Sequence, residues 1–278
     1  MRRILLYIFV YLAVYGLVVC VGTWAWYMLG EGQGAAEAWH SFATATALTP
    51  AVMCALTATY TVLLLYIYIT RQWCPRPWLA PEHVVPVIYL LTAWAALATL
   101  LPSLALQELL PPLPDAAREQ TMTLLSSPYG YIMIGLLAPV LEEVVFRGAV
   151  LKALVDRTQR PALAIVLSAL IFALLHFNPA QMSHAFLVGL LLGWLCLRTG
   201  SIVPGILFHW LNNTTAYALA RLAPQCNDQS LGEVFGSSAL AVGAVALSTA
   251  CLIAAVIILQ RRTRATTIGH RHHIDPQK

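Results

Sequence analysis

The chain has 278 residues, of which 59% are hydrophobic and only 10% are charged, with 16 Lys and Arg against 12 Asp and Glu. Soluble domains carry about 25% charged residues, so this composition excludes an ordinary soluble enzyme, and its high hydrophobicity excludes an intrinsically disordered chain. The six cysteines have no CxxC spacing, so we interpret them as apolar packing residues rather than as a disulfide scaffold or a zinc site. The composition therefore favours an integral membrane protein.

Eight runs are apolar enough to predict membrane-spanning helices, which need about 20 mostly apolar residues. In chain order these runs cover residues 4–30, 46–70, 84–106, 129–155, 161–178, 184–198, 202–221 and 235–260. The first run is far longer than the apolar core of a signal peptide, which has about 7–15 residues, so we predict a retained span. The fifth, sixth and seventh runs are short or marginal, which indicates helices buried among others. The predicted fold class is an all-α, polytopic membrane helix bundle with about eight transmembrane helices.

The loop charges predict the topology of this bundle, because cytoplasmic loops are enriched in Lys and Arg. With the N-terminus inside, the thirteen basic residues on the cytoplasmic side are Arg2, Arg3, Arg71, Arg76, Lys152, Arg157, Arg160, Arg198, Arg261, Arg262, Arg264, Arg271 and Lys278. Only Arg118 and Arg221 fall outside, together with most of the acidic loop residues. We therefore expect both termini to be cytoplasmic, in a multi-pass protein of a bacterial inner membrane.

Three charged residues remain inside the predicted spans, and all of them are in the fourth: Glu142, Glu143 and Arg147. An ionisable group within the bilayer is costly and marks a candidate functional site. On a helix Glu143 and Arg147 share a face and can pair, whereas Glu142 points about 100° away. We expect one acid to be neutralised by the arginine and the other to face a cavity as a general base. The alternative is that both acids only hold the bundle together.

Further polar groups lie in the fifth and seventh runs. His176 ends the segment Phe172-Ala-Leu-Leu-His176, and His209 is followed four residues later by Asn213 on the same helix face. A lone histidine in an apolar helix is more often a satisfied core residue than a catalyst. Together, however, these runs supply a carboxylate, two imidazoles and an amide, which is the set that water-activated acyl hydrolysis needs.

These residues resemble three motifs of the CPBP family of intramembrane proteases, also called the ABI family, which includes the type II CAAX prenyl endopeptidases. Glu142-Glu143-Val-Val-Phe-Arg147 fits EExxxR, Phe172-Ala-Leu-Leu-His176 fits FxxxH, and His209-Trp-Leu-Asn-Asn213 fits HxxxN, in the family's order. The resemblance covers roughly residues 130–220. Each motif is weak alone, and three in order among eight apolar runs are a strong signal.

The resemblance implies a role for each motif residue. Glu142 would activate a water molecule together with His176, and His209 and Asn213 would stabilise the oxyanion. Glu143 and Arg147 would form a supporting pair, with Phe172 packed against the site. A divalent metal such as zinc on Glu142, His176 and His209 is left open, because the ligand types fit but the sequence has no HExxH motif.

The sequence therefore predicts an intramembrane endopeptidase that acts on a membrane-associated or lipid-modified peptide or protein, with no nucleic-acid partner. The expected organisation is residues 1–128 as the first three membrane helices, 129–221 as the catalytic core of helices four to seven, 222–260 as the last helix and 261–278 as a basic cytoplasmic tail. Two other functions stay open: a non-catalytic scaffold or bacteriocin-immunity protein that binds a peptide in the same cavity, and a proton-coupled transporter. The substrate and the oligomeric state are not predicted.

Overall fold

The computed structural model of the chain describes residues 2–44, 46–80, 84–226 and 229–263, and helices are the only regular elements in these ranges. The elements are α1 (Arg2–Ala25), η1 (Trp26–Gly30), α2 (Ala35–Ala43), α3 (Pro50–Thr70), α4 (Arg76–Leu79), α5 (Pro86–Leu109), α6 (Arg118–Ser126), η2 (Ile132–Leu137), α7 (Ala138–Glu142), η3 (Glu143–Leu151), α8 (Lys152–Thr158), α9 (Pro161–Leu174), α10 (Pro179–Thr199), α11 (Val203–Leu222), η4 (Pro224–Cys226), α12 (Leu231–Val234) and α13 (Ser238–Arg262). The predicted all-α fold is confirmed. The predicted basic tail lies outside the described residues from residue 264 onwards.

Proline and glycine set many of the helix boundaries. Pro50, Pro86, Pro161 and Pro179 each occupy the start of a helix, where the missing N–H costs no intrahelical hydrogen bond. At the other end of α10, Gly200 adopts a left-handed conformation with φ of 68° and stops the helix. The long helices therefore begin and end close to the turn residues of the sequence.

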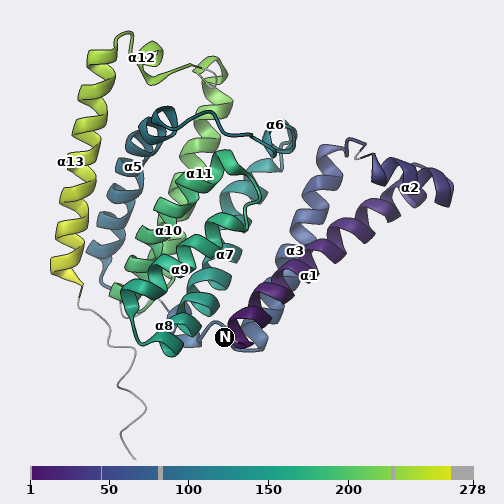
Figure 1. Cartoon of the computed structure of the whole chain (residues 1–278), viewed down its shortest axis with the longest axis horizontal. Coiled ribbons are helices and arrows are strands. Elements are labelled where there is room, and N and C mark those ends of the chain that lie inside the picture. Colours follow the sequence, from purple (N-terminus) through teal and green to yellow (C-terminus); the bar gives the residue numbers. More distant parts are fainter. Residues whose placement is uncertain (1, 45, 81–83, 227–228, 264–278) are drawn as a thin grey trace, which may run out of the picture.

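The helices form two groups (Figure 1). Helices α1 and α3 lie against each other on one side of the molecule, and the Tyr68 hydroxyl of α3 donates a 2.6 Å hydrogen bond to the Tyr7 carbonyl of α1. In the other group, α5 packs against both α11 and α13, and the Ser248 hydroxyl donates to the Ala98 carbonyl across the α5 and α13 contact. Helices α9 and α10 pack together at the centre.

The fourth predicted span is one continuous helical run from η2 to α8, and part of it is not α-helical. Residues Ile132–Leu137 and Glu143–Leu151 form π-helix, with a wider turn than an α-helix. All nine residues of η3 are buried, so this run is the centre of the core. π-Helical turns occur frequently at functional sites, and η3 begins at Glu143, directly after Glu142.

Five helical segments are long and apolar enough to cross a membrane. They are Arg2–Gly30, Pro50–Thr70, Pro86–Leu109, Pro179–Thr199 and Ser238–Arg262. Helix α9 is apolar but has only 14 residues, and the run from η2 to α8 is divided by π-helix. The structure supports an integral membrane protein, and the count of eight spans stays a prediction.

Two predicted boundaries differ from the structure around residue 177. Helix α9 ends at Leu174, so His176 lies just beyond the helix, whereas the predicted run continued to residue 178. Phe177 has a φ of 52°, which no regular helix accommodates. Helix α10 then begins at Pro179, earlier than the predicted residue 184. The short helices α2 and α6 were not predicted, because they are amphipathic or polar rather than apolar throughout.

Candidate active site

A cavity of about 250 Å³ lies between the two groups of helices, since Thr57 and Tyr60 of α3 line it together with residues of the second group. The four residues expected to be catalytic, Glu142, His176, His209 and Asn213, all line it. They come from α7, the turn after α9, and α11, so the fold brings together side chains that are up to about 70 residues apart in the sequence. Phe172 lines the same cavity.

Glu143 and Arg147 form a buried ion pair below this cavity. Their Oε1 and Nη1 atoms are 3.0 Å apart, and the two side chains are 0% and 1% exposed. The Arg147 guanidinium also lies 4.4 Å from the centre of the Phe172 ring and donates to the Gly189 carbonyl at 3.4 Å. The buried positive charge of Arg147 is therefore compensated by a carboxylate, an aromatic face and a backbone carbonyl. This pair therefore fixes η3 against α9 and α10.

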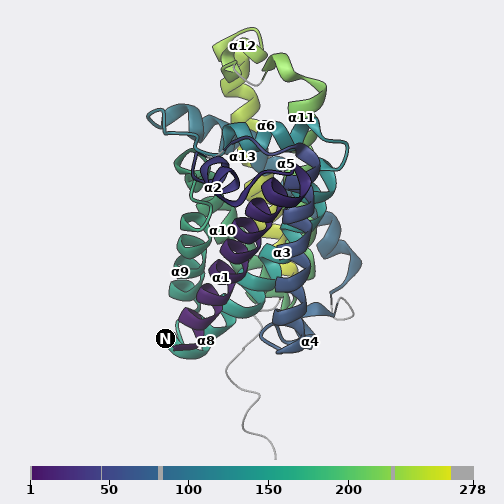
Figure 2. The ribbon, with the colours of Figure 1, turned by 90° about the vertical axis from the view of Figure 1, so that its right-hand side faces the viewer.

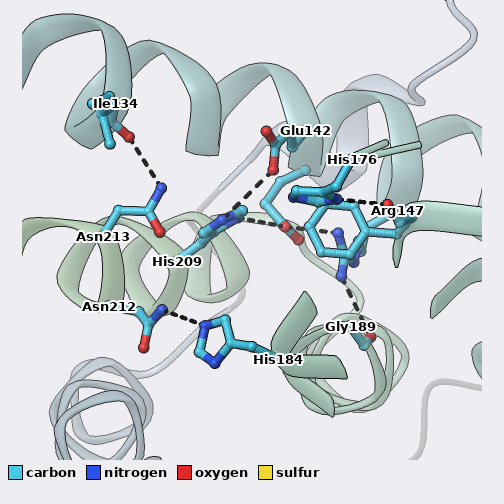
Figure 3. A network of polar contacts seen from close by, with 11 residues as sticks. Ile134, Glu142, Arg147, His176, His184, Gly189, His209, Asn212 and Asn213 are labelled. Atoms are coloured by element: carbon cyan, nitrogen blue, oxygen red, sulfur yellow. Dashed lines mark hydrogen bonds and ion pairs between the residues drawn. The ribbon is translucent and has the colours of Figure 1, made fainter. Parts of the chain in front are cut away.

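His209 lies between the two carboxylates, and Figure 3 shows its contact with Glu142. Its Nδ1 is 3.2 Å from Glu143 Oε1, within hydrogen-bond distance, and its Nε2 is 3.6 Å from Glu142 Oε2. The side chain of Glu142 is 19% exposed, whereas Glu143 has no exposed surface. The adjacent acids therefore differ as helix geometry predicts: Glu143 is enclosed with Arg147, and Glu142 faces the cavity.

Gly205 of α11 allows this arrangement, since its backbone lies directly beside the buried carboxylate of Glu143. A Cβ atom at position 205 would be 2.9 Å from Glu143 Oε2. Glycine thus lets α11 approach η3, which brings His209, four residues later in α11, to the two acids.

His176 is held from its Nδ1 side. The Nδ1 atom is 2.8 Å from the Phe172 carbonyl, and the His176 ring packs edge-to-face on the Phe172 ring with centroids 4.7 Å apart. Phe172 also meets the His209 ring edge-to-face at 6.0 Å. The phenyl ring thus lies between both imidazoles and the Arg147 guanidinium.

Asn213 is engaged with the backbone in this structure. Its Nδ2 donates a 3.0 Å hydrogen bond to the carbonyl of Ile134 in η2 (Figure 3). Its side chain still lines the cavity. The bond holds α11 against η2 and fixes the direction of the amide.

Two further residues of the cavity were missed by the sequence reasoning, His184 and Asn212. The Nδ2 atom of Asn212 is 3.2 Å from His184 Nε2, and Asn212 is buried (Figure 3). Asn212 directly precedes the predicted Asn213, and His184 was assigned to the edge of a predicted span. The signal that could have found them is that both are strongly polar residues inside runs that otherwise are apolar.

The residues do not form a metal centre as they stand. Within the described part of the chain, no three His, Cys, Asp or Glu side chains converge in a way that could hold a metal ion. The predicted ligand set of Glu142, His176 and His209 therefore does not converge on a common point in this arrangement.

Residues 124–215 match the family model described as type II CAAX prenyl endopeptidase Rce1-like. The chain carries an Rce1-like domain. No match was found among curated proteins or among solved structures. The matched segment is about a third of the chain and runs from α6 to α11, so it contains Glu142, His176, His209 and Asn213.

The Rce1-like domain supports protease activity of the CAAX type within a membrane, in general terms. The matched residues include most of the cavity lining, whereas Thr57 and Tyr60 of α3 line the cavity from outside the match. Helices α1, α3, α5 and α13, which surround it, lie outside the matched residues.

Proposed function

We propose that this protein is an intramembrane endopeptidase that hydrolyses a peptide bond in a membrane-associated or lipid-modified protein, with Glu142 as the base that activates water. The observation that carries the proposal is the division between the two acids. Glu143 is enclosed in its ion pair, and Glu142 is partly exposed in a cavity that also holds His176 and His209.

Glu142 is suited to the role of general base because its Oε2 borders the cavity and has no cation beside it except the His209 ring at 3.6 Å, among the described residues. A carboxylate used as a base must be within hydrogen-bond reach of the water that it deprotonates. A water molecule in the cavity can approach Glu142 without displacing the buried pair.

His176 complements this base. With Nδ1 donating to the Phe172 carbonyl at 2.8 Å, the neutral ring has an unprotonated Nε2 that can accept a proton or orient the water. The Phe172 ring fixes the orientation of this imidazole. His176 and Glu142 would thus approach the same water from two elements, α7 and the turn after α9.

His209 is suited to the stabilisation of the oxyanion. An N–H at His209 Nδ1 would donate to Glu143 Oε1 at 3.2 Å, and an N–H at Nε2, which lies 3.6 Å from Glu142 Oε2, would face the cavity. Asn213 lies on the same face of α11 and would supply a second donor if its amide turned from the Ile134 carbonyl toward the substrate. Donors of this kind stabilise the charge that develops in acyl transfer.

The reaction then balances with these residues alone. The water oxygen attacks the scissile carbonyl carbon while Glu142 takes the water proton, and the carbonyl oxygen becomes an oxyanion near His209 and Asn213. Collapse of the tetrahedral intermediate breaks the C–N bond, and the proton held by Glu142 passes to the leaving amine nitrogen. The products are a carboxylic acid, which keeps the second proton of the water until it ionises, and a new amine.

The test uses purified protein in liposomes with a library of internally quenched peptides, both prenylated and unmodified. Glu142→Gln, His176→Ala and His209→Ala should each lower kcat/KM by about 10²-fold or more, which is the usual contribution of a positioned acid or base. Glu37→Gln and His40→Ala are the matched controls, because both residues are exposed in α2 and neither lines the cavity. Full activity of Glu142→Gln would overturn the proposal and favour a protein that only binds its peptide.

A further inference from the structure

We propose that the active-site cavity is entered from the non-cytoplasmic face of the membrane, so that the substrate is a peptide segment of an exported, membrane-associated protein. This rests on the proposed function for the cleavage itself. The direction of entry rests on separate observations: the charges at the two ends of the bundle, the residues that line the cavity, and the packing that closes it.

The two ends of the molecule carry opposite charge. The N-terminus, α4 and α8 lie at one end, and α2, α6 and α12 lie at the other (Figures 1 and 2). The described basic residues of the first end are Arg2, Arg3, Arg71, Arg76, Lys152, Arg157, Arg160, Arg198, Arg261 and Arg262, with Asp156 as its described acid. The described charged residues of the second end are Glu31, Glu37, Glu108, Asp115, Glu119 and Glu233, with Arg118 and Arg221.

This distribution orients the protein in the membrane. Short loops rich in Lys and Arg stay in the cytoplasm. The end with α4 and α8 is therefore cytoplasmic, and the end with α2, α6 and α12 faces the other side. The structure brings together at each end the loop charges on which the predicted topology was based.

The active-site cavity continues toward the end that carries α6. A second hollow, of about 440 Å³, is lined by α6, by the last turn of α5 and by the second half of α11. The residues that line both this hollow and the active-site cavity are Thr121, Ile134, Gln181, His184, Asn212 and Asn213. A path thus leads from the surface near α6, past Gln181, to Glu142 and His209.

The opposite direction is closed by packed side chains. Below Glu142 lie the buried Glu143 and Arg147 pair and the residues of η3, all of which are buried. Ile202, at the start of α11, has no exposed surface, and its N–H donates to the Trp78 carbonyl of α4. A substrate from the cytoplasmic end would have to disrupt this core to reach the cavity.

The entrance also has the chemistry of a peptide channel. Its lining includes the polar side chains of Gln107, Gln181 and Tyr217, which can bond an extended backbone. Asp115 adds a carboxylate there, which accepts a hydrogen bond from Asn178. This lining offers hydrogen-bonding groups to a peptide segment next to a membrane anchor, and Met122 and Leu125 add apolar surface. A protein prenylated in the cytoplasm would approach from the closed end.

The test is the accessibility of single cysteines to a membrane-impermeant maleimide in sealed vesicles of both orientations. The background has Cys20, Cys226 and Cys251 replaced by serine, and it retains the buried Cys54, Cys74 and Cys196. Gln181→Cys reports the entrance, Glu37→Cys in α2 reports the same end outside the cavity, and Arg71→Cys reports the basic end. All three positions are exposed.

Gln181→Cys and Glu37→Cys should react in right-side-out vesicles, with at least tenfold less labelling in inverted vesicles, and Arg71→Cys should show the opposite pattern. Labelling of Gln181→Cys from the Arg71 side, from both sides or from neither side overturns the inference. Adding Glu142→Gln should leave the labelling pattern unchanged. Failure of the proposed chemistry is thus distinguished from failure of the proposed entry side.

Discussion

The buried pair of Glu143 and Arg147 gives the sharpest prediction for stability. Arg147→Met removes the guanidinium from a site where it is 1% exposed and leaves the carboxylate of Glu143, which is 0% exposed, without its cation. Removing one partner of a buried pair costs about 3–5 kcal/mol, because the remaining charge is uncompensated. The variant also loses the contact with the Phe172 ring, which contributes about 0.5–2 kcal/mol. We expect Arg147→Met to be destabilised by about 3.5–7 kcal/mol in total.

The double variant separates the ion pair from general packing. Glu143→Gln together with Arg147→Met replaces both charges by neutral side chains of similar size, and such replacements are often close to neutral. The double variant should therefore be less destabilised than the sum of the single variants, with an interaction energy of about 3 kcal/mol. The measurement is reversible unfolding in mixed micelles, followed by circular dichroism.

The chain contains a matched control for this cycle. Lys152 and Asp156 have the same spacing of four residues and a 2.7 Å contact, but their side chains are 29% and 50% exposed. An exposed pair of this kind contributes about 0.3–0.5 kcal/mol. An interaction energy for Glu143 and Arg147 that is no larger than that of Lys152 and Asp156 would refute the reasoning.

Two further predictions concern close packing and burial. Gly205→Ala should destabilise the protein by about 1–3 kcal/mol, because its Cβ would be 2.9 Å from Glu143 Oε2. Gly243→Ala in α13 is the control: no atom lies within 4 Å of its Cβ, so this variant should be neutral or stabilising in the same unfolding assay. Equal destabilisation by the two substitutions would contradict the close approach of α11 to Glu143. Burial raises the pKa of the Cys74 thiol to about 12, so its reactive thiolate is scarce below that pH. In folded protein at pH 8–9 Cys74 should stay unlabelled by maleimide while Cys226 reacts, as peptide mapping would reveal, and equal labelling would count against the packing around Cys74.

The parts of the fold that depend on local sequence could be predicted. Each of the eight apolar runs corresponds to a helix or to a continuous helical run, since long apolar segments leave few alternatives to helix in a membrane. The contact between Glu143 and Arg147 follows from their spacing of four residues. The different surroundings of Glu142 and Glu143 follow from the same helix geometry.

Other features depend on contacts between distant residues and could not be predicted. The π-helical turn from Glu143 to Leu151 is set by packing on all sides, since the whole segment is buried. The contact of His184 with Asn212 joins residues 28 positions apart. The engagement of Asn213 with the Ile134 carbonyl joins two elements whose separation the sequence does not specify. The position of α6 beside the entrance of the cavity likewise depends on contacts between residues that are distant in the sequence.

The most direct test of the account is mass spectrometry of peptide termini in membranes that contain either the wild-type protein or Glu142→Gln at equal abundance. The account predicts at least one new pair of termini in a membrane-associated protein with the wild type, and the loss of that pair with Glu142→Gln, because the water then lacks its base. The same new termini at equal yield in both samples would contradict the role of Glu142. No difference between the wild type and a membrane without the protein would contradict the proposed protease itself.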